Sequence, residues 1–103
     1  MALRFKTTDP RGMTVICADE AWQHIITRRH FANLSEIQAA IEHPLSIHKD
    51  SDHNHKQIYY GEGVRKNEYI KVVTQFRGQS TLVVVTAYHT SNTKPGEEEI
   101  WRR

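Results

Sequence analysis

Three runs of β-branched and aromatic residues, separated by short turn-forming segments, constrain the fold of this chain most strongly. Short breaks that contain Gly favour hairpins, so successive runs should pair as antiparallel strands. A shorter strand is expected before them, because apolar Leu45 and Ile47 alternate with polar residues, and an edge segment carrying Ile100 and Trp101 is expected near the end. The three runs are Ile58 to Tyr60, Tyr69 to Phe76 and Thr81 to Tyr88, and the breaks contain Gly61-Glu62-Gly63 and Arg77-Gly78-Gln79.

Two helical stripes precede these strands. Asp19 is a suitable N-cap for a helix over Glu20 to His30, which carries its apolar side chains on one arc. Ser35, together with Gln38, forms a capping-box pattern for a second helix over about residues 36 to 43. Because helices and strands are segregated along the chain, the sequence predicts an α+β domain. Two N-terminal helices should pack on one face of a roughly four-stranded antiparallel sheet.

Length and composition favour one domain in a reducing compartment. The chain has 103 residues and no Pro/Gly/Ser-rich stretch that would divide it, so residues 1–103 are expected to form a single domain. Its single cysteine, Cys17, cannot form an internal disulfide, and the N-terminus lacks the apolar stretch of a signal peptide. The longest aliphatic run, Leu82 to Val85, is far shorter than the ~20 residues that a membrane helix needs. We therefore expect a cytoplasmic protein without a membrane span.

Basic residues gather at two places, although the net charge is only +2. A charge this small neither demands nor excludes a nucleic-acid partner. The two groups could form the margins of a phosphate-binding surface, and scattered solvated charge is the alternative interpretation. They are Arg28-Arg29-His30 at a helix end, and Arg65, Lys66 and Lys71 around the start of a strand.

Polar residues of two neighbouring strands are expected to share the face of the sheet that the helices leave open. Successive side chains of a strand point to opposite faces, so Thr86, Tyr88 and Thr90 share one face, and Tyr69 and Lys71 share a face in the run before. An ordinary solvated sheet face, on which Thr, Tyr and Lys are common, is the alternative. The positions expected to face the helices are Ile70, Val72, Phe76, Val83, Val85 and Ala87.

One single histidine and one group of three histidines could have a functional role. His30 borders the apolar arc of the first helix and is directed toward the sheet, where an imidazole can take or give a proton at physiological pH. A histidine that caps the last helix carbonyls is the alternative. His48, His53 and His55 are interspersed with aspartates, but their spacing matches no specific metal-binding pattern. We expect a solvated loop there, no metal ligands and no cofactor.

Five short motifs follow one another in a moderately specific order. They are Trp22-x-x-Ile25 with His30 at the helix end, Ile41-x-x-Pro44-x-x-Ile47, Ile58-Tyr59-Tyr60, Val72-Val73, and Val85-Thr86-Ala87-Tyr88-His89-Thr90. Together with the order of elements, they resemble the phage-associated branch of the barnase-EndoU-colicin-RelE (BECR) nuclease-like group. The resemblance covers most of the chain, from about Trp22 to Thr90, and implies a barnase-like nuclease domain with the BECR fold.

The resemblance also implies a metal-independent endoribonuclease, of the kind found among toxin-type effectors. In this group a general base activates the ribose 2'-hydroxyl, which attacks the adjacent phosphate and leaves a 2',3'-cyclic phosphate and a 5'-hydroxyl. Here His30 would transfer a proton and approach Tyr88 across the sheet edge, while Thr86 and Tyr88 would donate hydrogen bonds or a proton. The basic catalytic residue would be Lys71 or Arg65. The substrate-binding residues would be Arg29, Arg65, Tyr69 and Thr90.

Two other functions stay open. A catalytically inactive module of the same fold would bind RNA or a protein partner through the open face, with Tyr59, Tyr69 and Tyr88 as contact residues. A toxin kept silent by a cognate inhibitor protein is the second. The expected partner is accordingly RNA, with tRNA as one candidate, or an inhibitor protein, and not a membrane.

Overall fold

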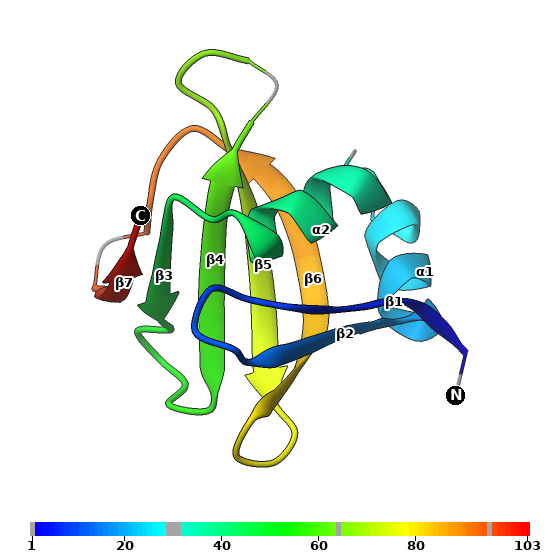
Figure 1. The fold of residues 1–103 in the computed structure, drawn as a ribbon. Coiled ribbons are helices and arrows are strands. Elements are labelled where there is room, and N and C mark those ends of the chain that lie inside the picture. Colours follow the sequence, from blue (N-terminus) through cyan, green and yellow to red (C-terminus); the bar gives the residue numbers. More distant parts are fainter. Residues whose placement is uncertain (1, 29–31, 64, 95) are drawn as a thin grey trace.

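The computed structural model describes residues 2–28, 32–63, 65–94 and 96–103. In chain order the elements are β1 (Leu3–Thr8), β2 (Thr14–Ala18), α1 (Asp19–Thr27), α2 (Leu34–Glu42), β3 (Ser46–Lys49), β4 (Lys56–Glu62), β5 (Tyr69–Phe76), β6 (Thr81–Thr90) and β7 (Glu98–Arg102). The strands form one sheet in the order β1-β2-β6-β5-β4-β3-β7. Helix α1 packs on β6 and β2, and α2 packs on β4, β5 and β1, so both helices lie on the same side of the long strands (Figure 1). The fold is therefore α+β.

The predicted four-stranded antiparallel sheet with two N-terminal helices is wrong. The described residues contain seven strands, of which β1 and β2 precede the helices, and the sheet is mixed. β2 runs parallel to β6, from Thr14 opposite Thr81 to Ile16 opposite Val83. This pairing joins segments far apart in the sequence, and the alternation of residues along one strand does not identify such a partner. The pairs formed by β3, β4, β5 and β6 are antiparallel, and β7 pairs with the outer side of β3.

A tight turn returns the chain from β1 to β2. Asp9 accepts hydrogen bonds from the backbone amides of Arg11 at 2.8 Å and Met13 at 3.0 Å, and Gly12 adopts the left-handed conformation with φ +86°. The hydroxyl of Tyr59 in β4 donates to the second carboxylate oxygen of Asp9 at 2.7 Å. These bonds hold the hairpin across the long strands, on the side of the helices (Figure 1).

The helix caps lie earlier than the sequence predicts. Asp19 is the first residue of α1 rather than its N-cap. α2 is capped by Asn33 instead of Ser35, because the Asn33 side chain accepts a hydrogen bond from the Glu36 amide at 2.8 Å and donates one to the Glu36 carboxylate at 3.0 Å. The predicted capping box of Ser35 and Gln38 is therefore wrong, and Asn33 and Glu36 cap the helix instead. No helix in the described ranges is long and apolar enough to cross a membrane.

A β-bulge in β6 changes which of its side chains face the core. β5 and β6 pair in register except at one step, where Val85 is an extra residue without a partner on β5. The alternation of side chains reverses at this residue, so Leu82 and Val84 are buried on the same side as Ala87. The prediction that Val83 and Val85 face the helices is wrong, and both are only partly buried.

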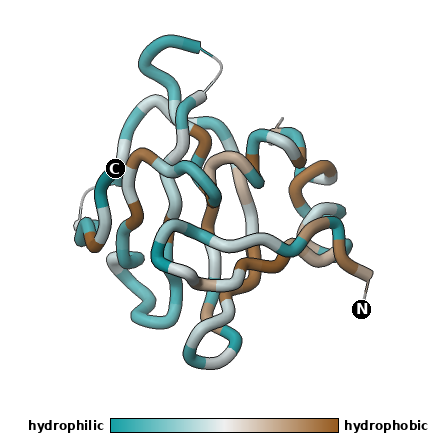
Figure 2. The backbone as a smooth tube through the Cα atoms, viewed as in Figure 1, coloured by the Kyte–Doolittle hydropathy of each residue, from teal (hydrophilic) through white to brown (hydrophobic). Residues whose placement is uncertain are grey.

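The core lies between the sheet and the two helices. Its fully buried side chains include Ile25 of α1, Ile37 and Ile41 of α2, and Val72 of β5. Figure 2 shows hydrophobic segments where the helices approach β2 and β6, and a hydrophilic loop between β4 and β5. The opposite face of β3 to β6, which the helices do not cover, is called the open face below.

Candidate functional site

The open face carries a row of aromatic and basic side chains across three strands. Lys71 of β5 lies directly opposite Tyr60 of β4 on one side and Tyr88 of β6 on the other. The Lys71 ammonium nitrogen is 5.5 Å from the centre of the Tyr60 ring and 5.8 Å from the centre of the Tyr88 ring. Cations at such distances from aromatic faces are attracted by the ring electrons. The sheet register thus places two residues of the predicted catalytic set, Lys71 and Tyr88, next to each other.

The remaining predicted residues on these strands occupy neighbouring positions. Thr86 lies opposite Val73, two residues from Lys71 along β5, and Thr90 lies opposite Tyr69. The hydroxyl of Thr86 is buried and has no hydrogen-bond partner among the described atoms. Arg65 is not on this face and lies exposed in the loop between β4 and β5. Arg29 and His30 lie outside the described residues, so the expected approach of His30 to Tyr88 stays a prediction.

Glu97 neutralises Lys71, which the sequence does not predict. One carboxylate oxygen of Glu97 lies 3.1 Å from the Lys71 ammonium nitrogen, and the Tyr60 hydroxyl donates a hydrogen bond to the other oxygen. The exposed fraction is 0% for the Glu97 side chain and 7% for that of Lys71. Burial lowers the pKa of Lys71, but the bond to Glu97 and the interaction with Tyr60 outweigh it and raise that pKa, so the ammonium stays charged. Burial and the bond to Glu97 raise the pKa of Tyr60, which therefore keeps its proton.

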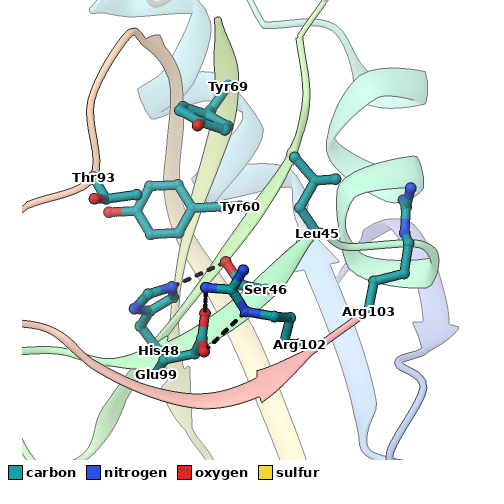
Figure 3. A pocket seen from close by; sticks show the side chains of 9 residues that line it. All are labelled: Leu45, Ser46, His48, Tyr60, Tyr69, Thr93, Glu99, Arg102 and Arg103. Carbon is teal, nitrogen blue, oxygen red and sulfur yellow. Dashed lines mark hydrogen bonds and ion pairs between the residues drawn. The ribbon is translucent and has the colours of Figure 1, made fainter. Parts of the chain in front are cut away.

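A cavity of about 430 Å³ opens beside this cluster, between β3, β4, β5 and β7. We call it the histidine pocket. Figure 3 shows His48, Glu99 and Arg102 at one end of it, Tyr69 at the other, and Tyr60 between them. Its lining residues are Leu45, Ser46, His48, Tyr60, Tyr69, Thr93, Glu99, Arg102 and Arg103.

His48 is held on the wall of this pocket by two contacts. Ser46 and His48 alternate with Ile47 on β3, so they share the open face while Ile47 enters the core. The Ser46 hydroxyl oxygen lies 2.9 Å from Nε2 of His48, and the Tyr60 ring meets the imidazole edge-on at 5.0 Å between ring centres. Nδ1 of His48 is buried without a hydrogen-bond partner within the described parts of the chain. The interpretation of His48 as part of a solvated loop is therefore wrong, because the residue lies in a strand and is 8% exposed.

A second, basic pocket of about 310 Å³ adjoins the first. Leu45 and Tyr69 line both pockets, so the two are neighbours with Tyr69 at their boundary, and together they are called the groove below. The basic pocket is named after the exposed Arg65 and Lys66, and Glu62 and Glu68 also line it. At the far end of the histidine pocket, the Arg102 side chain is 73% exposed and forms an ion pair with Glu99 at 2.7 Å. Both ends of the groove therefore carry exposed cationic side chains together with carboxylates, and the Tyr69 ring lies between them.

The other histidine-rich segment shows no comparable organisation. The rings of His53 and His55 lie 5.6 Å apart between centres, in the exposed loop before β4. Among the residues that the structure describes, no group of three or more His, Cys, Asp or Glu side chains could hold a metal ion. The fully buried Cys17 is no candidate nucleophile, since burial raises the pKa of its thiol to about 11.

Comparisons of this chain with protein-family models, with curated proteins and with solved structures find no match.

Proposed function

We propose that this protein is a metal-independent endoribonuclease that binds single-stranded RNA along the groove formed by the histidine pocket and the basic pocket. The observation that carries this proposal is the sequence of groups along the groove, with Arg65 and Lys66 at one end, Tyr69 at the middle, and His48 with Arg102 at the other. Single-stranded RNA is recognised by aromatic rings that stack on its bases and by cations that contact its phosphates. An imidazole beside such a site is suited to proton transfer at neutral pH.

The cleavage chemistry assigns a role to each group. His48 Nε2 is the candidate base, and a ribose 2'-hydroxyl in the pocket would replace the Ser46 hydroxyl as its hydrogen-bond partner. As the base takes the proton, the 2'-oxygen bonds to phosphorus, the bond to the 5'-oxygen breaks, and an acid returns a proton to that oxygen. Tyr88 lines neither pocket and is separated from β3 by β5 and β4, so the proton that returns to the 5'-oxygen comes from solvent water. Arg102 at the pocket rim is paired with Glu99 at 2.7 Å, and it would exchange part of that pairing for the phosphate to stabilise the charge that develops there.

Cleavage assays with excess EDTA test the proposal directly. The purified protein should cut total RNA and tRNA, and the products should carry 2',3'-cyclic phosphates. His48→Gln should lower the rate about 10²-fold or more, the usual scale for the loss of a proton-transfer group. His53→Gln is the matched control, since His53 is exposed in a loop, and its rate should equal that of the wild type. Cleavage only after addition of a divalent ion, or equal rates for both variants, would refute the proposal. The thermal unfolding midpoint of each variant shows whether a lower rate comes from the loss of a catalytic group or from unfolding.

The ion pair of Lys71 favours a second candidate, a module that binds RNA without cutting it. The ammonium of Lys71 faces Glu97 instead of the groove, so Lys71, one of the two candidates for the basic catalytic residue, does not reach a substrate in this arrangement. Tight binding of an oligonucleotide without any cleavage of total RNA or tRNA would favour this candidate over the enzyme.

A further inference from the structure

Among the described residues from 91 to 99, Glu97 alone buries its side chain. The described residues on either side of it, 91–94, 96, 98 and 99, are all exposed, whereas the exposed fraction of the Glu97 side chain is 0%. A surface segment seldom buries a carboxylate, because removing the charge from water is unfavourable unless it is paired. The sheet beneath therefore presents a site that binds a negatively charged group strongly enough to hold it out of water.

That site has two donors placed for two oxygens of one anion. The Lys71 ammonium contacts one oxygen of Glu97 at 3.1 Å, and the Tyr60 hydroxyl donates to the other. The backbone amide of Lys94 donates to the Tyr60 oxygen at 3.3 Å, which orients the hydroxyl. A phosphate group presents the same feature, two acceptor oxygens on one central atom, and forms short charge-assisted bonds with ammonium and hydroxyl donors.

The buried pair is poorly explained by stability alone. Replacing a buried ion pair with packed apolar residues often leaves a protein equally stable, so such a pair is weak evidence that stability maintains it. The position of the pair points to binding instead. Tyr60 is part of it and also lines the histidine pocket, so the anion site and the groove share a wall.

We propose that Lys71 and Tyr60 form a phosphate-binding site, and that the carboxylate of Glu97 is its internal occupant, which a phosphate of bound RNA displaces. The identity of the natural ligand as RNA rests on the proposed function, whereas the phosphate site itself is tested without RNA. When the phosphate displaces the Glu97 carboxylate, the Lys71 ammonium pairs with the substrate instead of with Glu97. The free protein is thereby kept in a state with low affinity for phosphate.

Glu97→Gln tests the site, with inorganic phosphate as the probe. The amide keeps the size of the side chain and removes its charge, so it no longer competes with an anion for Lys71. If Glu97 occupies the site more than nine-tenths of the time, its removal should tighten phosphate binding about tenfold or more, because apparent affinity scales with the fraction of open sites. Glu98→Gln is the matched control, since that side chain is 72% exposed and contacts only the exposed Lys49 in the described structure. Titration calorimetry and the thermal midpoint with added phosphate report the effect.

The outcomes separate the site from the proposed function. Adding Lys71→Met to the Glu97→Gln variant should abolish the gain in phosphate binding. An unchanged affinity in folded Glu97→Gln, or an equal gain in Glu98→Gln, would overturn the site. Should Glu97→Gln not fold, Glu97→Asp takes its place, since the shorter side chain keeps the charge but reaches Lys71 and Tyr60 less well. Its affinity for phosphate should rise by a smaller factor, and an unchanged affinity would overturn the site. RNA binding is measured with a 2'-O-methyl oligonucleotide, which cannot be cleaved. If Glu97→Gln binds phosphate more tightly but does not bind the oligonucleotide more tightly, the phosphate site is supported and RNA is excluded as its ligand.

Discussion

Gly61→Ala should destabilise the fold, because α2 packs directly against the backbone of β4 at this position. A Cβ atom on Gly61 would lie 2.6 Å from Cβ and 2.8 Å from Cα of Ala40, and 3.0 Å from Cγ2 of Ile70. Ala40 has no rotatable side chain that could turn away, so α2 itself must move. Overpacking of a core by one methyl group usually lowers the free energy of unfolding by about 1–3 kcal/mol. For a domain of this size, each kcal/mol lowers the midpoint of thermal unfolding by roughly 4–8 °C.

A double-mutant cycle in urea identifies the contact that causes this loss. Ala40→Gly alone should lower the free energy of unfolding by about 1–2 kcal/mol, through its helix propensity and the lost burial of one methyl group. In the double variant the 2.6 Å contact is absent, while the Cα of residue 40 and Cγ2 of Ile70 stay close, so part of the loss caused by Gly61→Ala should be restored. We expect the double variant to be more stable than the sum of the single effects by about 1 kcal/mol or more. Additive effects, or a Gly61→Ala change below about 0.5 kcal/mol, would show that α2 does not press on the backbone of β4 at this position.

Three further predictions concern the hairpin contact, a buried thiol and the groove. Tyr59→Phe removes a donor from the buried Asp9 carboxylate and should lower the free energy of unfolding by about 1–3 kcal/mol in urea, whereas a change near zero would mean that the bond does not hold the hairpin. Burial raises the pKa of Cys17 from 9.0 to about 11, so its contribution to stability is present below pH 9 and is lost as the pH rises to about 11. Cys17→Ala should therefore flatten the pH dependence of stability in that window, and an identical slope would contradict the assignment. Tyr69→Ala should weaken binding of the 2'-O-methyl oligonucleotide by about 1–3 kcal/mol in fluorescence anisotropy while Tyr69→Phe retains it, and equal losses in both variants would exclude stacking.

Features that depend on local periodicity could be predicted from the sequence. β5 spans Tyr69–Phe76, the range that its alternating pattern predicts. The same alternation places Lys71, Thr86 and Tyr88 on one face of the sheet. Successive strands joined by short Gly-containing breaks also pair as neighbours, because a short connection leaves few other arrangements.

Pairing between segments that are distant in the sequence cannot be predicted from local patterns. β1 is an edge strand of largely exposed residues, and only the Asp9-Pro10-Arg11-Gly12 turn before β2 signals a hairpin there. The parallel partner of β2 is β6, which follows only after both helices and three further strands, so no local pattern encodes the pairing. The bulge at Val85 likewise leaves no mark in a run of valines, although it exchanges the faces of the residues before it.

The charge that the open face presents also depends on both local alternation and contacts between distant segments. Alternation places Lys71 on that face, but whether its charge reaches a ligand is decided by Glu97, a residue 26 positions later that comes from a segment without periodicity. His48 shows the converse, because its surroundings of charged residues suggest a solvated loop, while its alternation with Ile47 places it in a strand and on a pocket wall. In both cases periodicity gives the direction of the side chain, and the tertiary partner gives its chemistry. A basic residue on a sheet face is therefore a candidate phosphate ligand only once the group that neutralises it has been identified, and in this protein the groove is expected to gain the charge of Lys71 only when an anion takes the place of Glu97.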